Sequence, residues 1–164
     1  MTRPRSIILL IVWFLWATGK DLDSLARYSI STDFYVFSSI GAAWLFFVIA
    51  GAVFLLNAAS VFYLFRPQPV GYVVLFLALA AGLAHTLIAL AIALSDLPGV
   101  REAYEIGREL RGLPVRPEAL DAIFTPSAML LGAALTVAAY AALAWLAHRN
   151  RAFFFGPADH AAEA

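Results

Sequence analysis

Two polar side chains interrupt the long apolar runs of this chain, and they are the first candidates for chemistry: His85 and Asn57. A histidine gains and loses a proton near neutral pH, and an asparagine amide both donates and accepts hydrogen bonds. Inside a membrane such groups usually face a partner or a water-filled cavity, but they also join one helix to another. Because the apolar runs contain no acidic residue, the structural role is favoured over a proton path.

A second set of candidates lies in the polar segment 96–125, where arginines can bind carboxylates, phosphates or lipid headgroups. This set comprises Arg101, Tyr104, Arg108, Arg111 and Arg116. The same arginines can instead pair with nearby acids, as Arg101 can with Glu105 four residues later. Local pairing would leave the apolar side of the segment to cap the protein at the headgroup layer.

Several kinds of chemistry are missing from the sequence. The chain has no cysteine, which excludes disulfides, thiolate metal ligands and cysteine nucleophiles. It has no HExxH helix, phosphate-binding loop, dinucleotide fingerprint or nucleophile elbow. We therefore expect no catalytic, cofactor or metal site. The formal net charge is +0 and the basic residues are scattered, so no nucleic-acid partner is expected.

Three charge-free runs, residues 34–65, 67–95 and 122–148, must position these side chains. A helix crosses a bilayer with roughly 20 apolar residues, and each run is long enough. Hydrophobic residues make up 63% of the chain and charged residues 13%, whereas charge is about 25% in soluble domains. The expected spans are residues 37–65, 71–95 and 126–147, and Pro67 ends the first of them.

The first apolar segment, residues 6–19, is shorter than the other three. It is either a span or the hydrophobic part of a secretory signal, and the aromatic residues near its end favour a retained span. After it, Leu22, Leu25, Ala26 and Ile30 share one helical face. This pattern predicts a short amphipathic helix that lies flat in the membrane interface.

We expect an all-α fold: a single domain, residues 1–164, forming an integral membrane four-helix bundle. The outer loop 96–125 holds short helices over residues 100–111 and 118–124, and residues 148–164 form a cytoplasmic tail whose last part, 156–164, is loose. Small residues at every fourth position let helices approach closely. Two such rows are Ala78, Gly82 and Thr86, and Ala128, Gly132 and Thr136.

Basic residues next to the spans predict the orientation. Arg3, Arg5, Arg66, Arg149 and Arg151 lie in short flanks, whereas the arginines of the 96–125 loop are diluted by acids. We therefore expect both termini in the cytoplasm and the loop outside. The composition, rich in alanine and arginine and poor in lysine, favours a bacterial inner membrane.

The favoured function is that of a non-catalytic accessory, scaffold or assembly subunit. It would contact a partner protein or lipid headgroups through the 96–125 loop, and a homo-oligomer is possible. The alternative is a small transporter or channel protomer with His85 and Asn57 along an intramembrane path. A membrane enzyme acting on lipid, using loop carboxylates such as Glu102, Glu105 and Glu109, is the least favoured.

Overall fold

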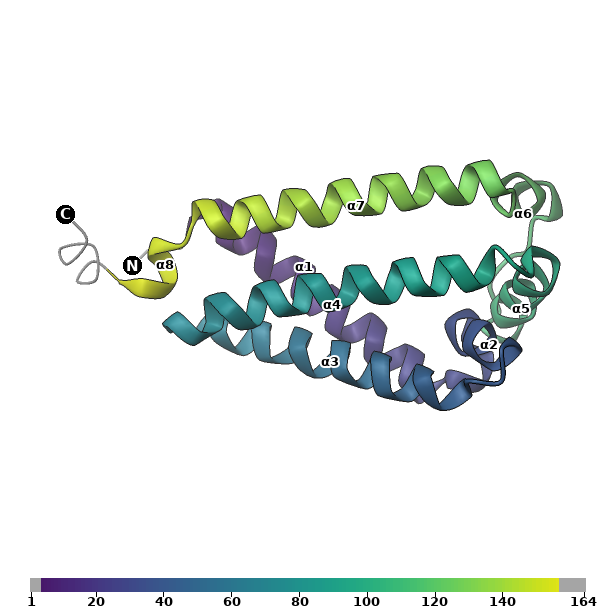
Figure 1. Ribbon diagram of the computed structural model, residues 1–164, viewed down its shortest axis with the longest axis horizontal. Coiled ribbons are helices and arrows are strands. Elements are labelled where there is room, and N and C mark those ends of the chain that lie inside the picture. The colour runs from purple at the N-terminus through teal and green to yellow at the C-terminus, as the bar shows by residue number, and fades with distance from the viewer. Residues whose placement is uncertain (1–3, 157–164) are drawn as a thin grey trace.

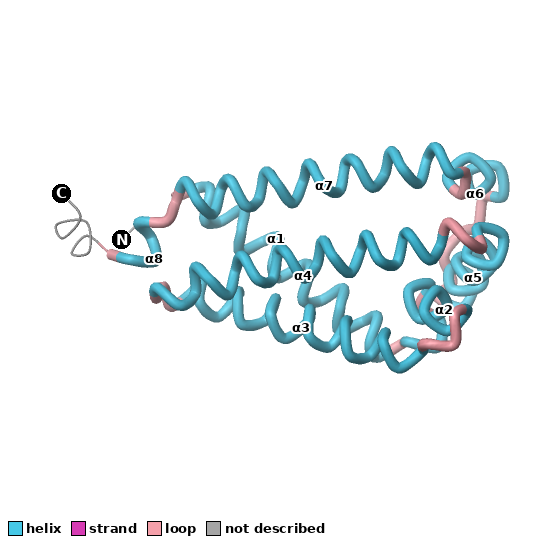
Figure 2. Tube along the Cα trace, viewed as in Figure 1, coloured by secondary structure: helices cyan, strands magenta, loops and turns pink. Residues whose placement is uncertain are grey.

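A computed structural model describes residues 4–156, and helices are the regular structure in this part of the chain (Figure 1, Figure 2). The expected all-α class is therefore confirmed. Arg3 and residues 157–164 of the predicted tail lie outside the described residues. The elements are α1 (Arg5–Ala26), η1 (Tyr28–Ile30), α2 (Thr32–Ser39), α3 (Ala43–Phe65), α4 (Pro69–Ala93), α5 (Leu97–Leu110), α6 (Pro117–Ile123), α7 (Pro126–Arg149) and α8 (Ala152–Phe155).

Within residues 4–156, 3 helices are long and apolar enough to cross a membrane: α3, α4 and α7. These helices come from the three charge-free runs, and their ends lie close to the predicted boundaries of 71–95 and 126–147. Pro69 is the first residue of α4 and Pro126 the first of α7, positions where the missing N–H of proline costs nothing.

The predicted boundary between a first span and a separate interfacial helix is wrong. Residues 5–26 form one continuous helix, α1, which ends at Arg27. The expected amphipathic helix is therefore the last turns of α1 followed by the short η1. Between residues 6 and 26 there is no proline, and a single glycine does not break a helix.

The run predicted as one span from 37 to 65 is also divided, because α2 ends at Ser39 and α3 begins at Ala43. Gly41 has φ of 73°, a left-handed conformation that favours glycine. Its N–H bonds the Ser38 carbonyl at 2.9 Å, and the Ala42 N–H bonds the Phe37 carbonyl at 3.0 Å. This pair of bonds is the Schellman motif that ends helices.

The long helices α1, α3, α4 and α7 lie side by side, with short helices at one end (Figure 1). We call the group η1, α2, α5 and α6 the cap, and the opposite end, with α8 and the α3–α4 turn, the termini end. At the termini end α1 lies beside α7, where Ser6 Oγ donates to Asn150 Oδ1 at 2.9 Å. Toward the cap α1 diverges from α7 (Figure 1).

Two apolar clusters hold these parts together. The termini-end cluster contains Ile7, Leu10, Phe14, Leu64, Leu75, Ala78, Leu79, Leu143, Ala147 and Phe154. The cap-end cluster contains Val36, Phe37, Phe46, Ala50, Ala89, Ala93 and Val100. The second cluster joins the cap helices α2 and α5 to α3 and α4, so the cap is packed onto the long helices.

Polar contacts fix the cap as well. Asp96 Oδ1 accepts from the Gly99 N–H at 3.1 Å and caps α5, while its Oδ2 accepts from the Tyr35 hydroxyl at 2.9 Å. Gly107 faces η1 so closely that an added Cβ would lie 2.7 Å from the Ile30 carbonyl oxygen. A glycine is therefore required where α5 crosses η1.

Candidate functional site

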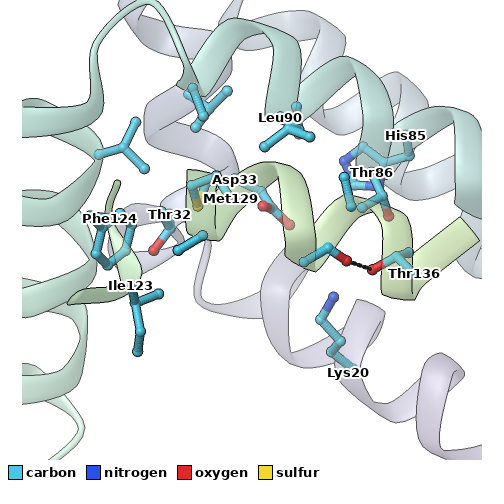
Figure 3. A pocket seen from close by; sticks show the side chains of 17 residues that line it. Lys20, Thr32, Asp33, His85, Thr86, Leu90, Ile123, Phe124, Met129 and Thr136 are labelled. Carbon is cyan, nitrogen blue, oxygen red and sulfur yellow. Dashed lines mark hydrogen bonds between the residues drawn. The ribbon is translucent and has the colours of Figure 1, made fainter. Parts of the chain in front are cut away.

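A cavity lies between α4 and α7 on the cap side, and we call it the central cavity. Its volume is about 400 Å³, within the usual range of ligand pockets, about 300–1,000 Å³. Lys20, Asp33 and His85 reach it from α1, α2 and α4 respectively (Figure 3). Thr86 and Thr136 also line it, and the remaining wall is mostly apolar.

A smaller cavity of about 220 Å³ adjoins the central cavity on the side of α1, and we call it the deep cavity. Lys20, His85, Thr86 and Thr136 line both cavities. The deep cavity adds a polar floor of Asp21, Asn57 and Tyr140.

Asn57, one of the two candidates of the apolar runs, is buried in the floor of the deep cavity. Its Nδ2 donates to Asp21 Oδ2 at 2.7 Å. This contact joins α3 to α1 and satisfies one carboxylate oxygen inside the protein. The same cavity brings Asn57 together with His85.

A third cavity, the cap cavity, opens among α1, α2 and α5 and has a volume of about 330 Å³. It shares Lys20, Thr32 and Asp33 with the central cavity, so those residues form a common wall. The other wall carries Arg108 and Arg111. Lys20 is the residue that lines all three cavities.

His85 lies at the centre of this arrangement. Its ring stacks on Phe37 with centroids 6.0 Å apart, and its Nε2 is buried without a hydrogen-bond partner. The charged groups that act on the ring are Asp33, Lys20 and Asp21. The structure therefore brings two acidic groups and one lysine to the cavities that His85 lines, although the apolar runs themselves contain no acid.

Sequence reasoning did not single out Lys20, Asp21 and Asp33. The first two were missed because the segment after residue 19 was assigned to the membrane surface. A signal was nevertheless available. Residues 13, 16, 17, 20 and 21 all line the deep cavity and follow the spacing of one helical face. A helix continued past residue 19 would have placed Lys20 and Asp21 below the two tryptophans on that face.

The loop arginines mostly have partners within the chain. Arg101 contacts Glu105 at 3.0 Å and Asp121 at 2.9 Å, and Arg111 lies 3.6 Å from Asp23.

The other members of that set lie where α5 meets α6. The Arg108 guanidinium donates to the Pro114 carbonyl through Nε at 3.0 Å and also contacts the Tyr104 hydroxyl at 3.3 Å. The Tyr104 ring packs on Phe124 with centroids 5.4 Å apart. Arg116 is exposed and precedes the first residue of α6.

The two rows of small residues lie in different surroundings. In the row of α4, Ala78 is buried in the termini-end cluster, and a Cβ on Gly82 would lie 2.6 Å from the Tyr140 hydroxyl of α7. Thr86 continues this row to the cavity wall. The row of α7, which comprises Ala128, Gly132 and Thr136, lines the central cavity.

The cavities end at the termini-end cluster. Trp13 packs edge-on against Tyr140 with centroids 5.9 Å apart, and both residues border the deep cavity. Beyond them the side chains are buried and apolar, including Leu10, Leu79 and Leu143. The polar surface therefore extends from the cap cavity to the middle of the long helices and stops there.

Residues 4–156 contain no group of 3 or more His, Cys, Asp or Glu side chains placed to hold a metal ion. Comparison of the chain with family models, with curated proteins and with solved structures found no match. Over the part of the chain that the structure describes, the fold defines the class: an all-helical protein with 3 helices long and apolar enough to cross a membrane.

Proposed function

We propose that this chain is an integral membrane bundle of α1, α3, α4 and α7 that binds a small polar solute, without catalysis, through its cap end. The observation that carries the proposal is the convergence of Lys20, Asp33 and His85 on one cavity from three helices. Polar and charged groups inside a membrane are costly, and they are usually kept for a functional site.

The depth of the site supports this reading. His85 lies eight residues before Ala93, the last residue of α4, which corresponds to about 12 Å along the helix axis. In a hydrocarbon core about 30 Å thick, that position is well below the headgroups. Water can hydrate polar walls at this depth only if a route leads to them. In this proposal the cap cavity, which is lined by polar side chains, is that route.

The orientation follows from the same proposal. With both termini in the cytoplasm of a bacterium, the cap faces the outer side of the inner membrane. Solute then enters from outside, between α1 and α5. A channel is a weaker alternative, because the apolar cluster around Leu10, Leu79 and Leu143 blocks a continuous path. A transporter would have to open that cluster in a second conformation.

Docking of a partner protein or lipid headgroups on the 96–125 loop is the second proposal. Arg116 favours it because its side chain is exposed. Three other arginines favour the solute-binding proposal instead, because they already have partners within the chain and stabilise the packing of the cap: Arg101, Arg108 and Arg111. A lipid-acting enzyme remains the third and weakest proposal.

The absence of cysteine from the chain makes a direct experiment possible. Thr136→Cys places a thiol on the cavity wall, and Leu135→Cys places one on a side chain that is 64% exposed on the outside of α7. In lipid nanodiscs, a charged, water-soluble thiol reagent should modify Thr136→Cys rapidly. Leu135→Cys, surrounded by lipid, should react slowly. Equal slow reaction at both positions would contradict a hydrated cavity.

A further inference from the structure

The class of solute can be inferred from the charges on the common wall of the central and cap cavities, an inference that rests on the function proposed above. Lys20 and Asp33 both lie on this wall. Among the residues that the structure describes, the ion pairs are Arg27–Asp23, Arg101–Glu105, Arg101–Asp121 and Arg111–Asp23. Lys20 and Asp33 belong to none of these pairs, so neither side chain is held in an ion pair within the described residues.

Under the proposed function, the cavities are hydrated when no solute is bound. A solute that displaces this water loses affinity unless it replaces the hydrogen bonds that the water made. It must therefore bring an anionic group to the Lys20 ammonium and a donating, cationic group to the Asp33 carboxylate. A purely anionic or purely cationic solute would make only one of these two charge-assisted contacts.

The rest of the central cavity is apolar. The side chains on this part of the wall are Leu90, Val100, Ile123, Phe124 and Met129. They come from α4, α5, the α6 region and α7, so they surround the space next to the charged wall. Burial of apolar surface against them favours a solute with a hydrocarbon part.

We infer that the central cavity takes a small amphipathic zwitterion of the amino-acid type. Its carboxylate lies at Lys20, its ammonium at Asp33 and its apolar side chain against Leu90, Phe124 and Met129. The volume of about 400 Å³ suits a molecule of this size. The headgroup of phosphatidylethanolamine combines the same two charges, so a lipid could also supply this chemistry.

Three related probes test the charge pattern: leucine carries both charges, leucine methyl ester only the ammonium and N-acetylleucine only the carboxylate. The readout is the rate at which a charged thiol reagent modifies Thr136→Cys in nanodiscs of phosphatidylglycerol. Leucine should slow the reaction, and each singly charged probe should need roughly tenfold higher concentration, as expected when one charged contact is lost. Equal potency of all three probes, or no effect of leucine, would overturn the inference.

Two substitutions assign the contacts. Lys20→Met should weaken the protection given by leucine and leave the protection given by leucine methyl ester unchanged. Asp33→Asn should weaken the protection given by leucine and leave the protection given by N-acetylleucine unchanged. Arg66→Gln removes a charge at the distant α3–α4 turn and should leave the protection given by every probe unchanged. Loss of protection by all three probes in both variants would contradict the assignment. If either variant fails to fold, the probe series on the Thr136→Cys protein still decides the question.

Nanodiscs that contain phosphatidylethanolamine distinguish the two sources of the zwitterion. If this lipid slows the modification of Thr136→Cys without added leucine, the lipid headgroup supplies the ligand. If only leucine acts, the ligand is a free molecule. Slow modification in phosphatidylglycerol nanodiscs without any probe would instead contradict the hydrated cavity of the proposed function. Rapid modification that no zwitterion slows would contradict the present inference alone.

Discussion

Asn57 Nδ2 donates a hydrogen bond to Asp21 Oδ2 at 2.7 Å, which joins α3 to α1 beneath the deep cavity. Asn57 is only 6% exposed, so the amide has little water to replace this partner. The contact turns two polar residues, far apart in the sequence, into one structural unit. It also explains how the Asp21 carboxylate is held next to apolar helices although it belongs to none of the ion pairs found within residues 4–156.

The pair can be tested by a double-mutant cycle. Asn57→Leu should destabilise the protein by roughly 1–3 kcal/mol, because it leaves a carboxylate oxygen of Asp21 without its donor. Asn57→Leu combined with Asp21→Leu should cost less than the sum of the two single changes. The measurement is thermal unfolding in detergent micelles. Strict additivity of the two effects would show that the side chains do not interact.

Gly82 allows α7 to approach α4, and its replacement gives a second prediction. In Gly82→Ala the new methyl group would lie 2.6 Å from the Tyr140 hydroxyl and 3.2 Å from its ring. Overpacking of this kind costs about 1–3 kcal/mol, so the midpoint of thermal unfolding should fall. Gly51→Ala is the matched control, since nothing lies within 4 Å of a Cβ there. An equal, small effect of both substitutions would argue against the contact.

The third prediction is that the stability contributed by the contact between Tyr35 and Asp96 in the cap decreases at alkaline pH. The hydrogen bond from Tyr35 to Asp96 raises the pKa of the Tyr35 phenol, and the charges of Asp96 and Glu102 raise it further. A raised pKa in the folded state means that the contact contributes fully below the ordinary tyrosine value of about 10. The contribution is lost as the pH rises through the folded pKa, because a phenolate cannot donate and repels Asp96.

Thermal unfolding measured between neutral and strongly alkaline pH checks this third prediction. The protein should lose stability as Tyr35 ionises, and Tyr35→Phe should be less stable at neutral pH with a weaker alkaline decline. Tyr28→Phe is a suitable control, because Tyr28 makes ring contacts with Phe34 and Phe47. The same alkaline decline in wild type and Tyr35→Phe would exclude the proposed cause.

Patterns within single segments of the sequence predicted much of the fold. The charge-free runs gave the apolar helices, and the predicted start of the last span at residue 126 agrees with α7, whose first residue is Pro126. The break at Gly41 was missed, although the glycine was visible. A glycine in an apolar run is compatible with a helix, and only the neighbouring backbone bonds decide that the helix ends there.

The site was harder to predict than the helices. His85 and Asn57 stood out because they are polar within apolar runs. Lys20 lies beside other charged residues in the last turns of α1, and Asp33 lies in the first turn of α2, where an acid is common, so nothing local distinguishes them. They reach one cavity only because α2 turns back over the long helices, a tertiary relationship that no periodicity in a single segment contains.

The central claim is that the cavities open to one side of the membrane, at the cap. The most direct measurement is the labelling of Thr136→Cys by a membrane-impermeant thiol reagent in membrane vesicles of either orientation. Leu113→Cys, between α5 and α6, marks the cap side, and Gln68→Cys, in the α3–α4 turn, marks the other. Our account predicts that Thr136→Cys reacts in the vesicles in which Leu113→Cys reacts. Reaction together with Gln68→Cys, or in neither orientation, would contradict it.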